Sequence, residues 1–271
     1  MIRALLIATV CSALVPLLGG CETLAPRADA GTGGDSPDGG STIRPRYEDY
    51  IRGDRFPKLV LEIDSVPGLE PRPSSTAGVI DAIDALVSKP GGISSATSPL
   101  SSAGADHAWT FAELQQLATS TFDLAAPSDT IKMHVLFVDG HSADDTQNGK
   151  ILGLAWAHTH LVVFKQTIES SCRTGVPSVL AEQVCADAEQ GVWTHEIGHI
   201  LGLVDNGLPM VTPHSDPEHV AHDHSSSCVM FWAYDTGSVL DEIRSRVIGG
   251  SASQLDFDAE CRNDVAAVRD R

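Results

Sequence analysis

Residues 193–205 read WTHEIGHILGLVD. His195 and His199 are four positions apart, which on an α-helix is a rotation of about 400° and a rise of about 6 Å. Both imidazoles therefore project from one face, one turn apart, as a Zn²⁺ ion requires of two ligands. Glu196 follows the first histidine, where its carboxylate can reach a metal-activated water and act as general base. Gly202 is a position at which such a helix can end.

The residues around this motif favour a zinc hydrolase over a chance match on a surface helix. Glycine stands three residues after the second histidine, and six of the chain's eleven histidines lie between positions 195 and 224. The sequence contains no GxSxG, no glycine-rich phosphate loop and no CxxC pair. Serine-hydrolase, nucleotide-binding and thiol-redox functions therefore have no support.

The stretch 193–232, with HEIGHILGLVD followed by Met230, resembles the metzincin metalloproteases. The resemblance implies a zincin-like mixed sheet with an active-site helix and a C-terminal helix. It also implies zinc as cofactor, a Met-turn beneath the metal and a peptide or protein substrate. Carried over residue by residue, it gives two ligands, a base, a turn and the Met-turn residue: His195 and His199, Glu196, Gly202 and Met230.

The chain departs from the metzincin pattern at the third zinc ligand. Asp205 stands where most members have histidine, although some small bacterial members have aspartate there. The block from His222 to Met230 instead resembles the ending of archaemetzincins, with the same spacing to Cys228 and with Asp223 in place of a cysteine. His222 is then the third ligand, after an inserted loop.

Alternatives for the third ligand stay open, because both imidazole and carboxylate are zinc ligands. The candidates besides His222 are Asp205, His214, His219 and His224. Many metzincins have tyrosine two residues after the methionine, where this chain has Trp232. The nearby Tyr234 is expected to be a packing residue rather than one that stabilises an oxyanion.

Apolar patterns predict one α+β (α/β-type) domain over residues 47–271. Alternating and β-branched residues predict strands over 58–66, 131–140, 151–158 and 159–168. Helical spacing predicts helices over 75–89, 109–122, 178–203 and 253–268. Residues 91–108, rich in Gly, Ser and Ala, are expected to form a loop. The strand before the active-site helix is expected to pair with an extended substrate.

The start of the chain indicates export. Residues 1–20 carry Arg3 and then an apolar run that is short for a membrane span, as in a secretory signal. The sequence LGGC at 18–21 resembles a bacterial lipobox, which implies a lipoprotein signal peptide and lipidation of Cys21. An ordinary cleaved signal or a short anchor is the alternative. Residues 21–46, which include the lipidated cysteine, are expected to be a flexible tether.

Four cysteines remain in the exported domain, which predicts two disulfides in an oxidising compartment. Pairing nearest neighbours in sequence gives Cys172–Cys185 and Cys228–Cys261. A four-cysteine zinc site is disfavoured because no CxxC pair is present.

The composition limits the partners. The 271 residues include 18 Lys and Arg against 36 Asp and Glu, a net charge of −18 without basic clusters. Nucleic acid is therefore an unexpected partner, and lipid rather than charge would hold the chain at a membrane. A monomer is expected.

Together these observations predict a zinc-dependent metalloendopeptidase, anchored by lipid in the bacterial cell envelope, with Glu196 as general base. Two alternatives remain. One is a non-catalytic, zinc-stabilised envelope binding lipoprotein, whose metal would be closed by four protein ligands. The other is a zinc amide hydrolase acting on a non-peptide or cell-wall substrate, because the motif does not specify the acyl group.

Overall fold

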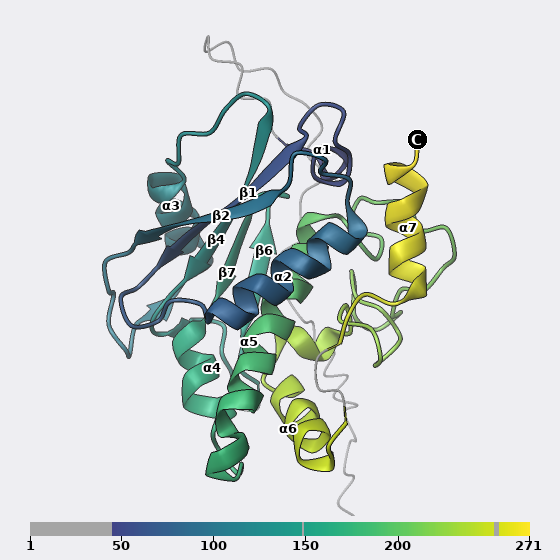
Figure 1. The fold of residues 1–271 in the computed structure, drawn as a ribbon. Helices are drawn as coiled ribbons and strands as arrows, with labels where there is room; N and C mark the ends of the chain where they lie inside the picture. Colours follow the sequence, from purple (N-terminus) through teal and green to yellow (C-terminus); the bar gives the residue numbers. More distant parts are fainter. Residues whose placement is uncertain (1–44, 148, 252–254) are drawn as a thin grey trace, which may run out of the picture. The chain divides into compact units, whose positions relative to one another are not determined.

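The computed structural model describes residues 45–147, 149–251 and 255–271. Their centre is a five-stranded sheet in the order β2-β1-β4-β7-β6 (Figure 1). Its strands are β1 (Lys58–Ser65), β2 (Ile93–Pro99), β4 (Thr130–Phe137), β6 (Gly153–Trp156) and β7 (His160–Val163). The neighbouring pairs are parallel except β6, which runs antiparallel to β7. β3 (Ala108–Trp109) and β5 (His141–Ser142) form a separate short pair.

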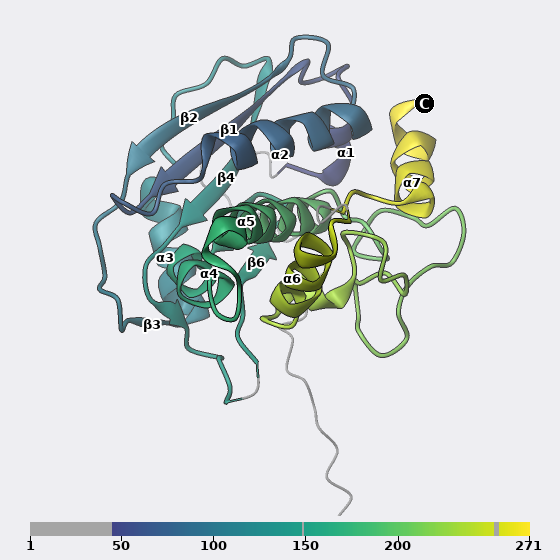
Figure 2. The same ribbon diagram turned by 60° about the horizontal axis from the view of Figure 1, so that its bottom comes forward.

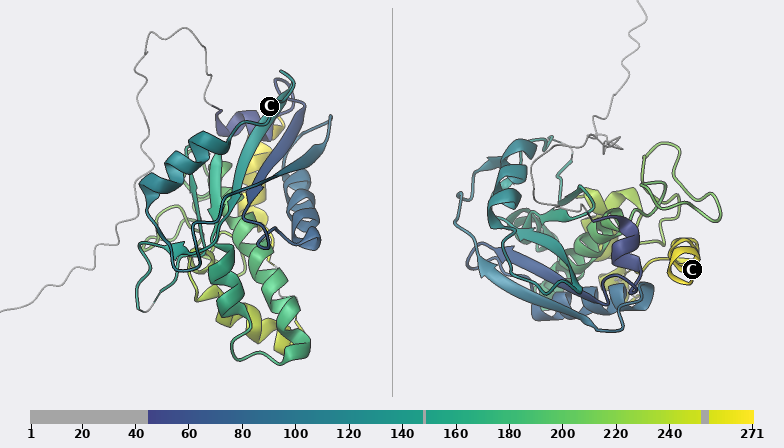
Figure 3. Two further views of the ribbon diagram at one scale, coloured as in Figure 1. Left: turned by 90° about the vertical axis from the view of Figure 1, so that its left-hand side faces the viewer. Right: turned by 90° about the horizontal axis from the view of Figure 1, so that it is seen from above.

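Both faces of the sheet are covered, as expected where most neighbouring strands are parallel. In β4, Met133, Val135 and Phe137 belong to the larger hydrophobic core, and Leu136 belongs to a smaller core on the other face. α2 (Pro73–Leu86) and α5 (Ser178–Ile200) cover the first face, and α3 (Phe111–Thr121) covers the second (Figures 1 and 3). The remaining helices are α1 (Tyr47–Ile51), α4 (Lys165–Cys172), η1 (Trp232–Asp235), α6 (Val239–Gly249) and α7 (Ala259–Arg269).

The structure confirms the predicted fold class and most predicted elements. α3 begins at Phe111, two residues after the predicted start, because Thr110 and Glu113 form a reciprocal capping box there. Three predictions are wrong. Residues 93–99 form β2 inside the expected loop, the strand expected over 159–168 ends at Val163 so that α4 can begin, and the predicted C-terminal helix begins only at Ala259.

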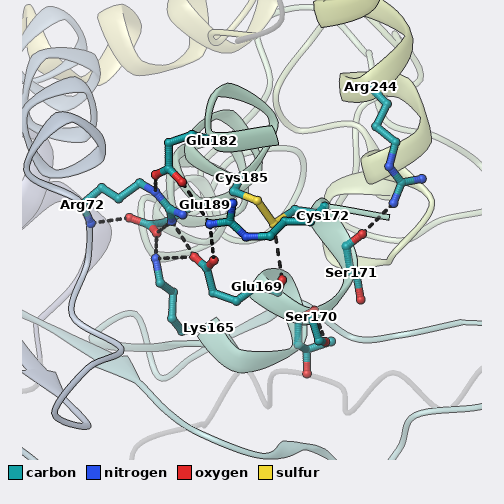
Figure 4. Close-up of a disulfide and its surroundings, with 12 residues drawn as sticks. Arg72, Lys165, Glu169, Ser170, Ser171, Cys172, Glu182, Cys185, Glu189 and Arg244 are labelled. Carbon is teal, nitrogen blue, oxygen red and sulfur yellow. Dashed lines mark hydrogen bonds and ion pairs between the residues drawn. A yellow bond between two sulfur atoms is a disulfide. The ribbon is translucent and has the colours of Figure 1, made fainter. Parts of the chain in front are cut away.

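A disulfide joins Cys172 at the end of α4 to Cys185 in α5 (Figure 4). The second expected disulfide is not formed. Cys228 and Cys261 are buried free thiols whose sulfur atoms lie 3.8 Å apart. The Cys261 thiol also lies 3.9 Å from Asp223 Oδ2 and donates a weak hydrogen bond to this buried carboxylate.

An ionic cluster surrounds the disulfide and connects three helices (Figure 4). Glu189 of α5 is fully buried and pairs with Lys165 of α4. It also accepts from the backbone N–H and the guanidinium of Arg72, which precedes α2, at 2.7 and 2.6 Å. Glu169 and Glu182 complete the cluster from α4 and α5.

Among the described residues, no helix combines the length and apolarity needed to cross a bilayer. The predicted signal peptide, Cys21 and nearly all of the tether lie outside the described residues.

Candidate metal centre

The helix that carries the HExxH motif is α5, and it ends where the glycine predicts. Leu203 N–H donates to the Gly198 carbonyl at 3.0 Å, and Gly202 N–H donates to the His199 carbonyl at 3.1 Å. This pair of bonds is a Schellman motif, and it needs the left-handed backbone that Gly202 adopts, with φ 77°. The chain therefore turns sharply away just past His199, which leaves the end of the helix facing the residues that follow.

Three imidazoles converge at this helix end, from His195, His199 and His222. Nε2 of His195 lies 3.0 Å from Nε2 of His199. The ring of His222 is stacked on His195, with centroids 5.2 Å apart. The structure thus brings together the two motif histidines and the histidine expected to be the third ligand, although these span 27 positions of the sequence.

The tautomers of two of these rings follow from their other nitrogens. Nδ1 of His195 donates to the Val229 carbonyl at 2.7 Å, and Nδ1 of His222 donates to the Val220 carbonyl at 2.8 Å. A carbonyl only accepts, so each Nδ1 carries the proton. In the neutral rings Nε2 then carries a lone pair that points into the cluster, which is the usual state of a metal-ligating histidine.

The backbone around Met230 holds this arrangement. Asp223 N–H donates to the Met230 carbonyl at 2.9 Å, which places His222 beside the segment whose Val229 carbonyl orients His195. The Met230 side chain is buried against α5, where a Cβ on Gly198 would collide with its sulfur. Residues 228–231 therefore fix the first and third imidazoles relative to each other.

Asp235 is a fourth donor in the cluster, and the sequence did not point to it. Its carboxylate oxygens lie 2.9 Å from Nε2 of His195 and 2.7 Å from Nε2 of His222. The donor atoms of His195, His199, His222 and Asp235 all lie within 4.8 Å of one another. Only the short distance between Met230 and Asp235 in sequence could have suggested it.

Glu196 lies on the same helix turn with a fully buried carboxylate. Neither of its oxygens has a hydrogen-bond partner among the described residues. A Cβ on Gly153 would collide with Oε1, so the carboxylate lies directly against the backbone of β6. A buried carboxylate without a donor is costly, and here it sits beside the lone pairs of a donor cluster.

These residues fit a divalent cation. Donors around a tetrahedral zinc ion, at bonds of about 2.0–2.1 Å, are about 3.3 Å apart, which is close to the contacts of 2.7 to 3.0 Å in the cluster. Three neutral imidazoles and the carboxylates of Glu196 and Asp235 sum to two negative charges, which one divalent ion would neutralise.

The ionisable groups of the cluster shift one another's pKa values. Burial, together with the neighbouring Asp235 charge, raises the pKa of Glu196 well above its ordinary value. Burial and the charge of His195 hold the pKa of His199 well below its ordinary value. Burial opposes the ionised form of Asp235, but His195 and His222 outweigh it and lower the pKa of that carboxyl.

The other candidates for the third ligand lie elsewhere. Asp205 is exposed in a left-handed turn, with φ 61°. His219 stacks on Trp232 and bonds to Asp216, and the half-exposed His224 bonds to a backbone carbonyl. None of these three belongs to the donor cluster.

His214 is buried in a second polar group. Its two ring nitrogens lie 2.6 Å from Asp223 and 2.9 Å from Asp264. Ligand atoms of His214, Asp223, Asp258 and Cys261 also lie within 4.8 Å of one another, but carboxylates engage both nitrogens of this histidine. The Tyr234 ring, by contrast, stacks on His195 with centroids 5.9 Å apart, and it is buried against α5 as expected of a packing residue.

The comparisons with known proteins found likeness only among solved structures. The chain is similar to an archaemetzincin from Methanopyrus kandleri, with 13% identity, 80% of this chain and 98% of that chain covered, and a TM-score of 0.48. It is also similar to a zinc-dependent peptidase from Methanocorpusculum labreanum, with 16% identity, coverage of 76% and 99%, and a TM-score of 0.46. No family model and no curated protein matches. We therefore infer the chemistry from the residues of this site.

Proposed function

We propose that this chain is a zinc-dependent metallopeptidase. The observation that carries the proposal is the convergence of three histidine nitrogens beside the buried, unpartnered carboxylate of Glu196. A purely structural metal site has no use for such a carboxylate, whereas a metallohydrolase needs a base at this place. His195, His199 and His222 would hold the ion.

A bound zinc ion would act as Lewis acid, polarising a substrate carbonyl and lowering the pKa of a water towards about 7. The chain's own base is Glu196, which takes the proton from the attacking water. It then gives this proton to the leaving amine as the peptide bond breaks.

The substrate strand is β6 in this proposal. β6 is an edge of the sheet, and its Gly153 lies against Glu196. An extended peptide can add to such an edge through backbone hydrogen bonds, which would bring its carbonyl groups to the base. β7, which comes next in the chain, is paired on both sides and cannot serve.

We further propose that the chain is exported and anchored in a bacterial envelope by lipid on Cys21. This part rests on the sequence of residues 1–21, which lie outside the described residues. The acidic net charge of −18 gives no attraction to anionic headgroups, so the lipid would be the anchor.

The test is hydrolysis of an unbiased peptide mixture by the purified chain, beside the Glu196→Gln variant. We expect the wild-type chain to cleave peptides, and the variant to bind one zinc ion while losing activity by about 10²–10⁴-fold, the contribution of a general base. Glu218→Gln is the matched control, because Glu218 is exposed and outside the cluster. A chelator should abolish cleavage.

Two other results would change the assignment. Zinc bound without peptide cleavage would favour the binding lipoprotein or a hydrolase for a non-peptide amide. Hydrolysis of a cell-wall amide would then identify the hydrolase, and no hydrolysis would favour the binding lipoprotein. Full activity in Glu196→Gln would reject Glu196 as the base.

A further inference from the structure

We propose that Asp235 is a fourth protein ligand of the metal, and that it closes the site at rest. The site would become reactive only when this carboxylate leaves the metal and frees its position for water or substrate. The proposal rests on the proposed function and adds a means of regulating the same site.

The contacts of Asp235 are those of a ligand. Its oxygens lie 2.9 and 2.7 Å from Nε2 of His195 and His222. The Nδ1 protons of both rings go to backbone carbonyls, so in the neutral rings each Nε2 offers a lone pair, whereas in the charged rings it donates to Asp235. A carboxylate and two lone pairs repel one another unless protons or a cation lie between them, and a metal ion satisfies all of them together.

Asp235 is not placed as a residue that only orients a ligand. Such residues accept from the ring nitrogen remote from the metal. In His195 and His222 the remote nitrogen is Nδ1, and the carbonyls of Val229 and Val220 occupy it. Asp235 instead meets the nitrogens that face the metal position.

Exposure identifies which side of the cluster Asp235 covers. The side chain of His195 is fully buried, and those of His199 and His222 are 12% exposed, whereas that of Asp235 is 32% exposed. A catalytic zinc site keeps its fourth position open to solvent and substrate. The carboxylate of Asp235 therefore lies on the side where that open position would be.

The segment carrying Asp235 is hydrogen-bonded to residues 150–152, which lead into the edge strand β6. The Asp235 carbonyl accepts from Leu152 N–H at 3.0 Å, and Gly237 N–H donates to the Lys150 carbonyl at 2.8 Å. A peptide that adds to β6 would thus dock beside the residues that hold Asp235. The carboxylate can turn out to solvent while this backbone pairing persists, so opening requires only a side-chain movement.

The experiment uses the full chain, purified in detergent and loaded with Co²⁺ in place of zinc, whose visible absorption reports the number and type of ligands. Acetohydroxamate, which needs an accessible metal position, is titrated into wild type, Asp235→Ala and Asp235→Asn. Asp129→Ala is the control, because Asp129 is half-exposed, pairs with Lys58 and lies outside the cluster.

We expect Asp235→Ala to keep one metal ion per chain, with a changed cobalt spectrum, zinc affinity lower by about 10-fold or more, and acetohydroxamate binding at least 10-fold tighter. Asp235→Asn, which keeps the shape of the side chain, should shift the same quantities in the same direction. The control should behave as wild type. Identical spectra and hydroxamate affinities in wild type and both Asp235 variants would overturn the proposal. A wild-type chain that binds no cobalt or zinc would instead reject the proposed function itself.

Discussion

His222 and Asp205 show how single residues define the candidate metal site. Both are chemically able to bind zinc, and Asp205 is much nearer to the motif in sequence. In the structure Asp205 is exposed, whereas Nε2 of His222 faces the cluster and its Nδ1 is held by a carbonyl. Orientation by a second hydrogen bond, rather than ligand chemistry, favours His222.

We therefore expect His222→Ala to lose stoichiometric zinc and Asp205→Ala to keep it. The first change removes one of three imidazoles from a converged set, and the second removes an exposed carboxylate that contacts none of them. Zinc content per chain after dialysis against a weak chelator distinguishes the variants. Full zinc in His222→Ala would reject His222 as the third ligand.

The sequence predicts the candidate site residues that share a helix turn, but it does not predict those that only the tertiary fold brings near them. His195, Glu196 and His199 are placed by helical spacing alone. Asp235 could not be predicted, because it depends on the turn of η1 and on the pairing of its backbone with Leu152. The free state of Cys228 and Cys261 also depends on the packing around them, and proximity in sequence predicted a bond that the structure lacks.

At the scale of elements, the length of the apolar pattern decided which predictions succeeded. α5 and β4 carry long apolar patterns, and both were predicted. β2 reads ISSATSP and is mostly exposed at the edge of the sheet, so it shows no apolar alternation. It forms because β1 offers it a full parallel ladder, which the sequence of β2 does not reveal.

The loop between α5 and η1, which carries His222, lies beside α7 (Figure 2) and is hydrogen-bonded to it. His214 bridges Asp223 in the loop and Asp264 in α7 and is buried between them. Burial disfavours the charged imidazole, but hydrogen bonds to both carboxylates outweigh burial and raise the pKa of His214. The loop that bears His222 is thus docked by a histidine whose charged form the fold favours.

This predicts a pH-dependent contribution to stability. A histidine whose pKa is raised on folding stabilises fully below its unfolded pKa of about 6.5, and the contribution is lost as pH rises through the folded pKa. The difference in free energy of unfolding between wild type and His214→Gln should be largest near pH 5.5 and shrink towards pH 9. Urea unfolding at several pH values measures it, with His107→Gln as the control, because the acidic partner of His107 is Glu113 rather than Asp223 or Asp264. A difference that does not change with pH would show that His214 contributes only through packing.

At the scale of the whole described domain, Glu189 joins elements that are far apart in sequence. Its carboxylate binds the backbone and guanidinium of Arg72 ahead of α2 and the ammonium of Lys165 in α4 (Figure 4). The HExxH motif lies six to ten residues further along the same helix, α5. Lys165 and Glu189 are both almost fully buried, so the ion pairs of the cluster, rather than solvent, stabilise their charges. The position of α5 against the sheet therefore depends on this cluster.

Glu189→Gln should lower the free energy of unfolding by about 3 kcal/mol, because it removes a fully buried carboxylate from Lys165 and Arg72 and leaves the two cations to share Glu169. Glu182→Gln is the matched control. It removes a carboxylate from the same Arg72, but Glu182 is 66% exposed, and such a pair contributes about 1 kcal/mol or less. Urea unfolding of the zinc-loaded chain compares the two variants. The domain should also lose zinc at lower urea concentration in Glu189→Gln, because the helix that carries two of the three histidines is held by this pair. Equal effects of the two substitutions would mean that solvent reaches Glu189 and that the cluster is not what fixes α5.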